Sequence, residues 1–121
     1  MSDVKTILVI DDEQEACEFI KSFLEARGYI VNAVYNGNDG IVAIKDKKPT
    51  LVFLDMRLPD MTGIDVLSKL REDKVTAKII LMTAIDDEKE IEKAKQLGAM
   101  GILSKPVQLP KLNEAVKNNI Q

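Results

Sequence analysis

Four apolar runs in this chain end on side chains that can take part in chemistry. The polar residues that follow them are Asp11 and Asp12, Asp55, Thr83, and Lys105. The run at residues 51–54 has no polar alternation, which is typical of a strand covered on both faces, and it stops on Asp55. A carboxylate in such a place can attack a phosphoryl group, with a hydroxyl and an ammonium stabilising the developing charge. Taken alone, Asp55 is more simply explained as the first residue of a turn, so its interpretation depends on the other strand ends.

The composition limits what this chemistry can be. The chain has no histidine, so it can build neither a Ser-His or Cys-His catalytic pair nor a His-ligated zinc site. Its net charge of -3 argues against direct binding of nucleic acid, and the single Cys17 cannot form an internal disulfide. No apolar run has the length of a membrane span or of a signal-peptide core. We therefore expect a cytoplasmic protein without membrane insertion, folded as a single domain over residues 1–121.

The apolar runs alternate with segments of helical periodicity. We expect strands at 7–10, 29–34, 51–54, 78–82 and 100–103, and helices at 14–27, around 41–44, and at 64–72, 87–97 and 109–120. Asp12 is expected to cap the first helix and Gly28 to end it. The Lys- and Glu-rich helix at 87–97 should be the most exposed.

This strict alternation predicts an α/β fold, with a five-stranded parallel sheet and helices on both faces. The second strand ends without a comparable polar side chain, which favours a place at the sheet edge in the order 2-1-3-4-5. In such a sheet, the ligand site lies at the carboxyl ends of the strands, near the point where the strand order reverses. Three carboxylates, one hydroxyl and one ammonium would then converge there.

Three carboxylates about 5 Å apart repel by roughly 3 kcal/mol per pair at an effective dielectric of about 20. A divalent cation would offset this repulsion, and an oxygen ligand set without nitrogen or sulfur points to Mg²⁺. Mg²⁺, Lys105 and Thr83 would together stabilise the charge of a phosphoryl group, and the small Ala84 would leave it room. The residues thus point to an aspartyl phosphate.

The complete pattern resembles the receiver domain of two-component response regulators, which is CheY-like, over essentially the whole chain. The features that match are Asp11-Asp12, the segment from Leu54-Asp55 to Gly63, Thr83-Ala84 and Lys105-Pro106. The resemblance implies a flavodoxin-like doubly wound fold. It also implies that Asp55 accepts a phosphoryl group from a phosphohistidine on a sensor histidine kinase or a histidine-containing phosphotransfer protein. Because this chain lacks histidine, that donor must be another molecule.

The same resemblance implies roles for the neighbouring residues. The implied magnesium ligands are Asp12, Asp55 and the backbone carbonyl of Arg57, with Asp11 acting through water; Mn²⁺ would be able to substitute. Lys105 would pair with the phosphoryl group, Thr83 would move to bond it, and the peptide bond between Lys105 and Pro106 would be cis.

The implied function is that of a stand-alone regulator or phosphorelay intermediate, not of an enzyme acting on other substrates. It would catalyse only its own phosphorylation and slow dephosphorylation. Phosphorylation would change the affinity for a downstream protein on the face made by the fourth helix, fifth strand and fifth helix. The protein would be a monomer or a phosphorylation-dependent dimer.

Three positions depart from the family pattern or bear on its kinetics. Family members commonly carry Tyr or Phe three residues before the lysine, where this chain has Ile102, so we expect a weaker or differently routed switch. Arg57 and Ile85 each lie two residues beyond an active residue, where a side chain can shield or orient the attacking water. Since neither can act as a base, we expect slow loss of phosphate.

Other classes of function fit this sequence less well. A haloacid-dehalogenase-like phosphatase would need an acid where Arg57 stands. A nucleotide or flavin fold would need glycines or hydroxyls after the first strand, where the acids Asp11, Asp12 and Glu13 would repel phosphate. The alternative from a different class is a pseudo-receiver, a protein-binding module that works without phosphorylation, which Ile102 keeps open.

Overall fold

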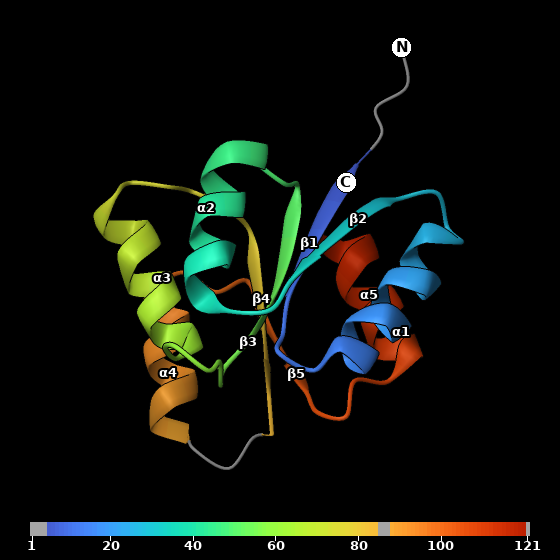
Figure 1. Cartoon of the computed structure of the whole chain (residues 1–121). Coiled ribbons are helices and arrows are strands. Elements are labelled where there is room, and N and C mark those ends of the chain that lie inside the picture. The colour runs from blue at the N-terminus through green and yellow to red at the C-terminus, as the bar shows by residue number, and fades with distance from the viewer. Residues whose placement is uncertain (1–4, 85–87, 121) are drawn as a thin grey trace.

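Five parallel strands alternate with five helices in the computed structural model, which describes residues 5–84 and 88–120 (Figure 1). The strands are β1 Thr6–Ile10, β2 Ile30–Val34, β3 Leu51–Asp55, β4 Ile79–Thr83 and β5 Gly101–Ser104. The helices are α1 Gln14–Glu25, α2 Gly37–Lys47, α3 Gly63–Glu72, α4 Glu88–Gln96 and α5 Leu109–Asn119. The sheet order is β2-β1-β3-β4-β5. The predicted fold class and strand order are therefore confirmed.

Helices cover both faces of the sheet (Figure 1). Side chains alternate across each strand, so β3 places Leu51 and Phe53 in the core with α1 and α5, and Val52 and Leu54 in the core with α2, α3 and α4. Every residue of β3 is buried, and this explains its unbroken apolar sequence. β3 is thus packed on both sides, and it places Asp55 at the carboxyl end of the sheet.

The start of α1 differs from the prediction. Asp12 does not cap this helix: the N-cap residue is Glu13, which makes no side-chain capping bond. The carboxylate of Asp11 instead accepts a hydrogen bond from the Glu13 N–H at 3.0 Å. Asp12 is left exposed at the mouth of the site. The helix ends as expected before Gly28, whose φ of 93° is left-handed.

Several element boundaries differ by one or two residues. Tyr29 donates its N–H to the carbonyl of Leu24 and so still belongs to the closing turn of α1, which is why β2 begins at Ile30. The predicted helix start at Asp87 lies outside the described residues, as does Ile85.

Ala94 is the only buried residue of α4, which agrees with the expectation that this helix is the most exposed. Among the described residues, no helix has the length and apolar character of a membrane span.

Candidate functional site

A pocket of about 330 Å³ lies at the carboxyl ends of β1, β3, β4 and β5. It is lined by Asp12, Glu13, Asp55, Met56, Arg57, Thr83, Ala84, Glu90 and Lys105. Asp11 lies beside it, fully buried. The structure therefore brings together the three predicted carboxylates, the threonine, the alanine and the lysine. They come from four strand ends that are far apart in the sequence.

Asp55 is almost fully buried, with 5% of its surface exposed. Its Oδ2 lies 3.0 Å from the Lys105 ammonium, and its Oδ1 accepts a hydrogen bond from the Arg57 N–H at 3.3 Å. Burial raises the pKa of Asp55 to about 6; the bond from Lys105 works against this shift, and the nearby charge of Asp11 adds to it. The metal-free site thus disfavours a second buried negative charge.

Lys105 is the cation at the centre of this pocket. Its Nζ lies 2.8 Å from Asp11 Oδ2, 3.0 Å from Asp55 Oδ2 and 3.5 Å from the exposed Glu13 Oε1. Burial alone would lower the pKa of Lys105, but the bonds to Asp11 and Asp55 outweigh it and raise that pKa. The Lys105 backbone N–H also bonds the Thr83 carbonyl at 2.8 Å. The ammonium is therefore held in place, charged, between two buried carboxylates.

The three aspartates are arranged so that they could hold a cation. One oxygen from each of Asp11, Asp12 and Asp55 lies within 4.8 Å of the others. Asp11 Oδ2 is buried, and among the described residues its one partner is the Lys105 ammonium, 2.8 Å away. A single ammonium for this many acids leaves negative charge in excess. The donor set therefore fits a hard divalent cation with oxygen ligands.

The loop after Asp55 is held by contacts to α2 and α3. Asp60 accepts hydrogen bonds from the N–H groups of Gly37 at 2.7 Å and Asn38 at 2.9 Å, at the start of α2. These bonds lower the pKa of Asp60. Gly63 begins α3 so close to the strand that a Cβ there would lie 2.9 Å from the Asp55 carbonyl. The backbone around the candidate nucleophile is therefore fixed from two sides.

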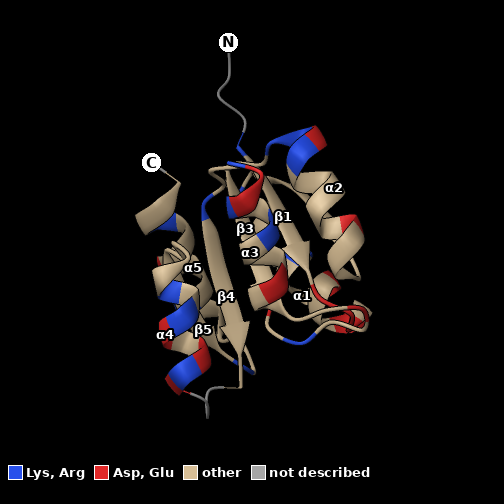
Figure 2. Ribbon diagram, turned by 90° about the vertical axis from the view of Figure 1, so that its left-hand side faces the viewer, with Lys and Arg blue, Asp and Glu red and all other residues tan. Residues whose placement is uncertain are grey.

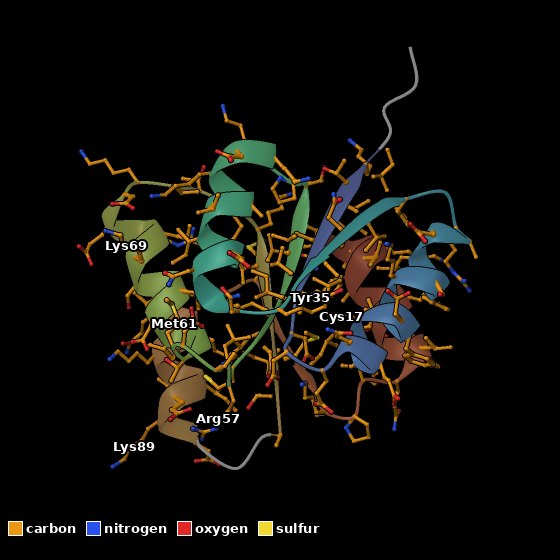
Figure 3. All side chains as sticks on the ribbon, viewed as in Figure 1. Cys17, Tyr35, Arg57, Met61, Lys69 and Lys89 are labelled. Atoms are coloured by element: carbon orange, nitrogen blue, oxygen red, sulfur yellow. The ribbon has the colours of Figure 1, made fainter. Side chains whose placement is uncertain are left out.

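Two acids of the pocket were not predicted as site residues. Glu13 directly follows the acid pair and reaches Lys105, so its place in the sequence was a usable signal. Glu90 comes from α4, and its carboxylate Oε2 lies 3.9 Å from Arg57 Nη2. Figure 3 shows Arg57 near the start of α4. No local pattern could have found this pair, because it joins a loop and a helix that meet only in the fold.

The remaining predicted residues lie at or beyond the pocket. The Lys105–Pro106 peptide bond is cis, as the resemblance implied, and Pro106 itself is exposed. Ile102 does not line the pocket: it is half-buried against the core shared with α2, α3 and α4, and lines a separate hollow of about 240 Å³ beside α5. Ile85 lies outside the described residues. The role of the Arg57 carbonyl stays a prediction.

Known proteins resemble this chain over most of its length. A family model described as response regulator receiver domain matches residues 7–117. The chemotaxis protein CheY of Halobacterium salinarum is 31% identical over 114 residues, which cover 94% of this chain and 95% of that protein. The alkaline phosphatase synthesis transcriptional regulatory protein PhoP of Bacillus subtilis is 34% identical over 113 residues, 93% of this chain but 47% of that protein. The chain thus spans about half the length of PhoP.

A solved structure shares the fold over the same extent. It is a CheY-like response regulator receiver domain protein from Methanospirillum hungatei, with a TM-score of 0.91 and 28% identity, covering 98% of this chain and 94% of that one.

Proposed function

Because this chain belongs to the response regulator receiver domain family, we propose that it is a phosphoryl-accepting signalling switch whose acceptor is Asp55. The observation that supports this most is the position of Lys105, whose ammonium lies 2.8 Å from Asp11 and 3.0 Å from the buried Asp55. Phosphoryl transfer depends on positioning and charge stabilisation more than on covalent chemistry. This pocket offers an acceptor oxygen, a fixed cation and the Thr83 hydroxyl in one place.

In the proposed reaction, a carboxylate oxygen of Asp55 attacks the phosphorus of a phosphohistidine. The new O–P bond forms as the P–N bond breaks, and the imidazole leaves with the electron pair of that bond. Lys105 pairs with the transferred phosphoryl oxygens, Thr83 moves to donate a hydrogen bond to them, and Ala84 leaves space. The chain catalyses only this transfer and a slow hydrolysis of its product.

Asp11, Asp12 and Asp55 would hold Mg²⁺, with the Arg57 carbonyl as a further ligand and Asp11 acting through water. The support is the acidic cluster, with one oxygen from each aspartate within 4.8 Å of the others and with the buried Asp11 Oδ2 facing a single ammonium. When bound, the ion neutralises charge on the carboxylates and the phosphoryl oxygens. Mn²⁺ can take the same place, because it also prefers oxygen ligands.

The donor protein is proposed to dock on a groove of about 610 Å³ that adjoins the pocket. The groove runs along α1 and the β5–α5 loop and shares Asp11 and Lys105 with the site. Phe19, which is 51% exposed, offers an apolar anchor there. Phe19→Ala should slow transfer from a histidine-containing phosphotransfer protein and leave phosphorylation by acetyl phosphate unchanged. Equal slowing with both donors would place the defect in the acceptor site instead.

Arg57 is proposed to set the lifetime of the phosphorylated state. Its guanidinium, on a side chain 72% exposed, lies 3.9 Å from Glu90 across the pocket mouth. Neither Arg57 nor Ile85 can act as a base for the attacking water, so we expect slow loss of phosphate. A lifetime of only seconds in the purified protein would contradict this. The phosphoryl lifetimes of Arg57→Ala and Glu90→Gln, compared with that of wild type, separate shielding by this pair from the chemistry of Asp55.

The output is proposed to involve the face of α4, β5 and α5. Ile102 stands where many family members have an aromatic residue. It has no hydroxyl that could change hydrogen-bond partners, and it has less apolar area to bury. Its response to phosphorylation should therefore be weaker than that of Thr83. Chemical shifts of Ile102 that moved as strongly as those of Thr83 on phosphorylation would count against this. The proposed switch acts in the cytoplasm, as a monomer or a phosphorylation-dependent dimer, on a downstream protein.

The decisive experiment uses acetyl phosphate as a small phosphoryl donor in the presence of Mg²⁺. Intact mass should show one added phosphoryl group on wild type and none on Asp55→Asn, and a chelator should abolish the reaction. A wild type that gains no phosphoryl group under these conditions would favour the second candidate, a pseudo-receiver that binds its partner without phosphorylation. Ile102 is the feature that favours this candidate.

A further inference from the structure

A second groove, of about 380 Å³, lies where α2 ends and where the segment from α3 enters β4. We call it the lysine groove; it is lined by Ile44, Lys45, Lys48, Pro49, Lys74, Val75, Thr76 and Ala77. These residues precede β3 and β4, whereas Asp55 ends β3. The lysine groove therefore lies at the opposite end of the sheet from the acidic pocket. Figure 2 shows lysine segments at this end, on the last turn of α2 and at the start of β4.

Two lysines of this groove occupy backbone conformations that favour glycine. Lys48 has a φ of 46° and Lys74 a φ of 59°, and they are the only non-glycine residues with positive φ in the described part of the chain. The turns after α1 and α4 place glycines, Gly28 and Gly98, in the left-handed region instead. Backbone preference therefore does not explain lysine at these two positions. Both lysine side chains lie at the same groove.

The walls of the groove are fixed in advance by contacts between elements. An ion pair between Lys45 and Asp73 ties the last turn of α2 to the end of α3. Arg71 donates hydrogen bonds to the carbonyls of Val75 at 2.7 Å and Ala77 at 3.3 Å, and these residues form the other wall. A groove that is already ordered loses little conformational entropy when it binds a ligand.

The charges of the groove are only partly balanced from within. Asp73 pairs with both Lys45 and Lys69. By contrast, the side chains of Lys48 and Lys74 make no ion pair or hydrogen bond with residues 5–84 or 88–120. Beneath them lie the buried Ile44 and the half-buried Val75 and Ala77. Two exposed ammoniums thus flank an apolar floor.

From this arrangement we propose that the lysine groove docks an acidic peptide segment of a partner protein, one that also carries an apolar side chain. Carboxylates of the segment pair with Lys48 and Lys74, and its apolar side chain packs on Ile44 and Val75. Nucleic acid is a poorer match, because Asp73 and neighbouring acids interrupt the basic surface and the chain as a whole carries a charge of -3. Docking here leaves Asp55 free for phosphoryl transfer.

The test uses a fluorescent copolymer of glutamate and leucine as the probe, with polyglutamate for comparison. Wild type should bind the copolymer more tightly than polyglutamate, with amide shift changes centred on Lys48, Lys74 and Val75. Lys48→Gln with Lys74→Gln should weaken binding at least tenfold. The charge-matched control, Lys47→Gln with Lys5→Gln, removes two lysines from the same end outside the groove and should stay within twofold of wild type. The glycine pair Lys48→Gly with Lys74→Gly keeps the backbone conformation and should lose binding equally.

Several outcomes would overturn the proposal. One is the absence of copolymer binding by wild type, and another is an equal loss in the charge-matched control, which would mean diffuse attraction only. Tighter binding to phosphatidylserine vesicles or to single-stranded RNA through the same lysines would assign the groove to a lipid surface or to nucleic acid instead. Asp55→Asn should bind the copolymer like wild type, so this result stands or falls separately from the proposed phosphorylation.

Discussion

The Lys105 ammonium lies 3.0 Å from the Asp55 carboxylate, on a side chain that is only 22% exposed, so one lysine balances the buried acids of the site. Removing it should leave Asp11 and Asp55 without their common cation. In a chelating buffer near neutral pH, Lys105→Met should lower the free energy of unfolding by about 1–3 kcal/mol. This is less than the loss for a fully buried pair, because solvent still reaches the lysine. Urea unfolding measures it, with the exposed Lys117→Met as control.

The same variant bears on the cation site. Lys105 repels any divalent cation held by the three aspartates, so Lys105→Met should bind Mg²⁺ more tightly than wild type. At a Mg²⁺ concentration about ten times the dissociation constant, binding should stabilise either protein by about 1.4 kcal/mol. The Mg²⁺ concentration that gives this stabilisation should therefore be lower for the variant. Unchanged stability in the chelator, or the same Mg²⁺ concentration for both proteins, would argue against the central position of Lys105.

Asp55 should destabilise the metal-free protein at neutral pH, since burial raises its pKa to about 6 from an ordinary value of 3.8. When the pKa of a carboxyl is higher in the folded state than in the unfolded state, the folded protein becomes less stable as the pH rises. The loss takes place between the pKa of the unfolded state and that of the folded state. In a chelating buffer, Asp55→Asn should therefore be more stable than wild type above pH 7, by about 1–3 kcal/mol. The difference should shrink towards zero below about pH 4.

Asp60 provides a control of opposite sign. Backbone N–H groups of Gly37 and Asn38 lower the pKa of Asp60. The charged carboxylate therefore stabilises the fold at pH values above the ordinary pKa. This stabilisation is lost as the pH falls through the pKa of the folded state. Asp60→Asn should be less stable than wild type at neutral pH, with a smaller difference in acid. Urea unfolding across this range checks both variants. If Asp55→Asn were less stable at neutral pH, the ion pair with Lys105 would outweigh burial.

The fold could be predicted from the sequence because the apolar runs, the helical periodicity and the residues at the strand ends all indicate the same parallel sheet. The unbroken apolar run of β3 reflects burial on both faces, and the absence of a strong polar residue after β2 reflects its place at the sheet edge. Convergence of Asp11, Asp55 and Lys105 followed from topology alone, since parallel strands bring their carboxyl ends to one edge. Residues that lie directly at strand ends were therefore within reach of sequence reasoning.

What escaped prediction depends on loop geometry and on contacts between distant segments. Asp12 is a good capping residue by type, but Asp11 takes the local hydrogen bond and the chain turns so that Glu13 becomes the N-cap. The pairs of Arg57 with Glu90 and of Lys45 with Asp73 join separate elements. No spacing in the sequence encodes such pairs, because they depend on how the helices lie against the sheet.

Cys17 should be chemically inert in the folded protein although it lies close to the site. Its side chain is fully buried and donates a hydrogen bond to the Asp11 carbonyl at 3.3 Å. Burial, with a further contribution from Asp11, raises the pKa of the thiol to about 12. In buffer at pH 8, a disulfide reagent should therefore react with Cys17 of the native protein only as fast as the structure opens. In urea, where the protein is unfolded, it should react as fast as with a free thiol. Immediate reaction of the native protein would contradict the buried position.

The left-handed residues that follow helices allow a matched pair of stability tests. Lys48, with a φ of 46°, should gain from glycine, because the strain of a side chain in this region exceeds the extra entropy of an unfolded glycine. We expect Lys48→Gly to raise the free energy of unfolding by about 0.5–1 kcal/mol. Gly28→Ala is the converse: a Cβ there meets nothing within 4 Å, so only its φ of 93° opposes alanine, and we expect a loss of about 1 kcal/mol. Urea unfolding of both variants gives the comparison. If Lys48→Gly were less stable than wild type, the lysine side chain would be stabilising the fold, and its left-handed conformation would not point to a role in binding.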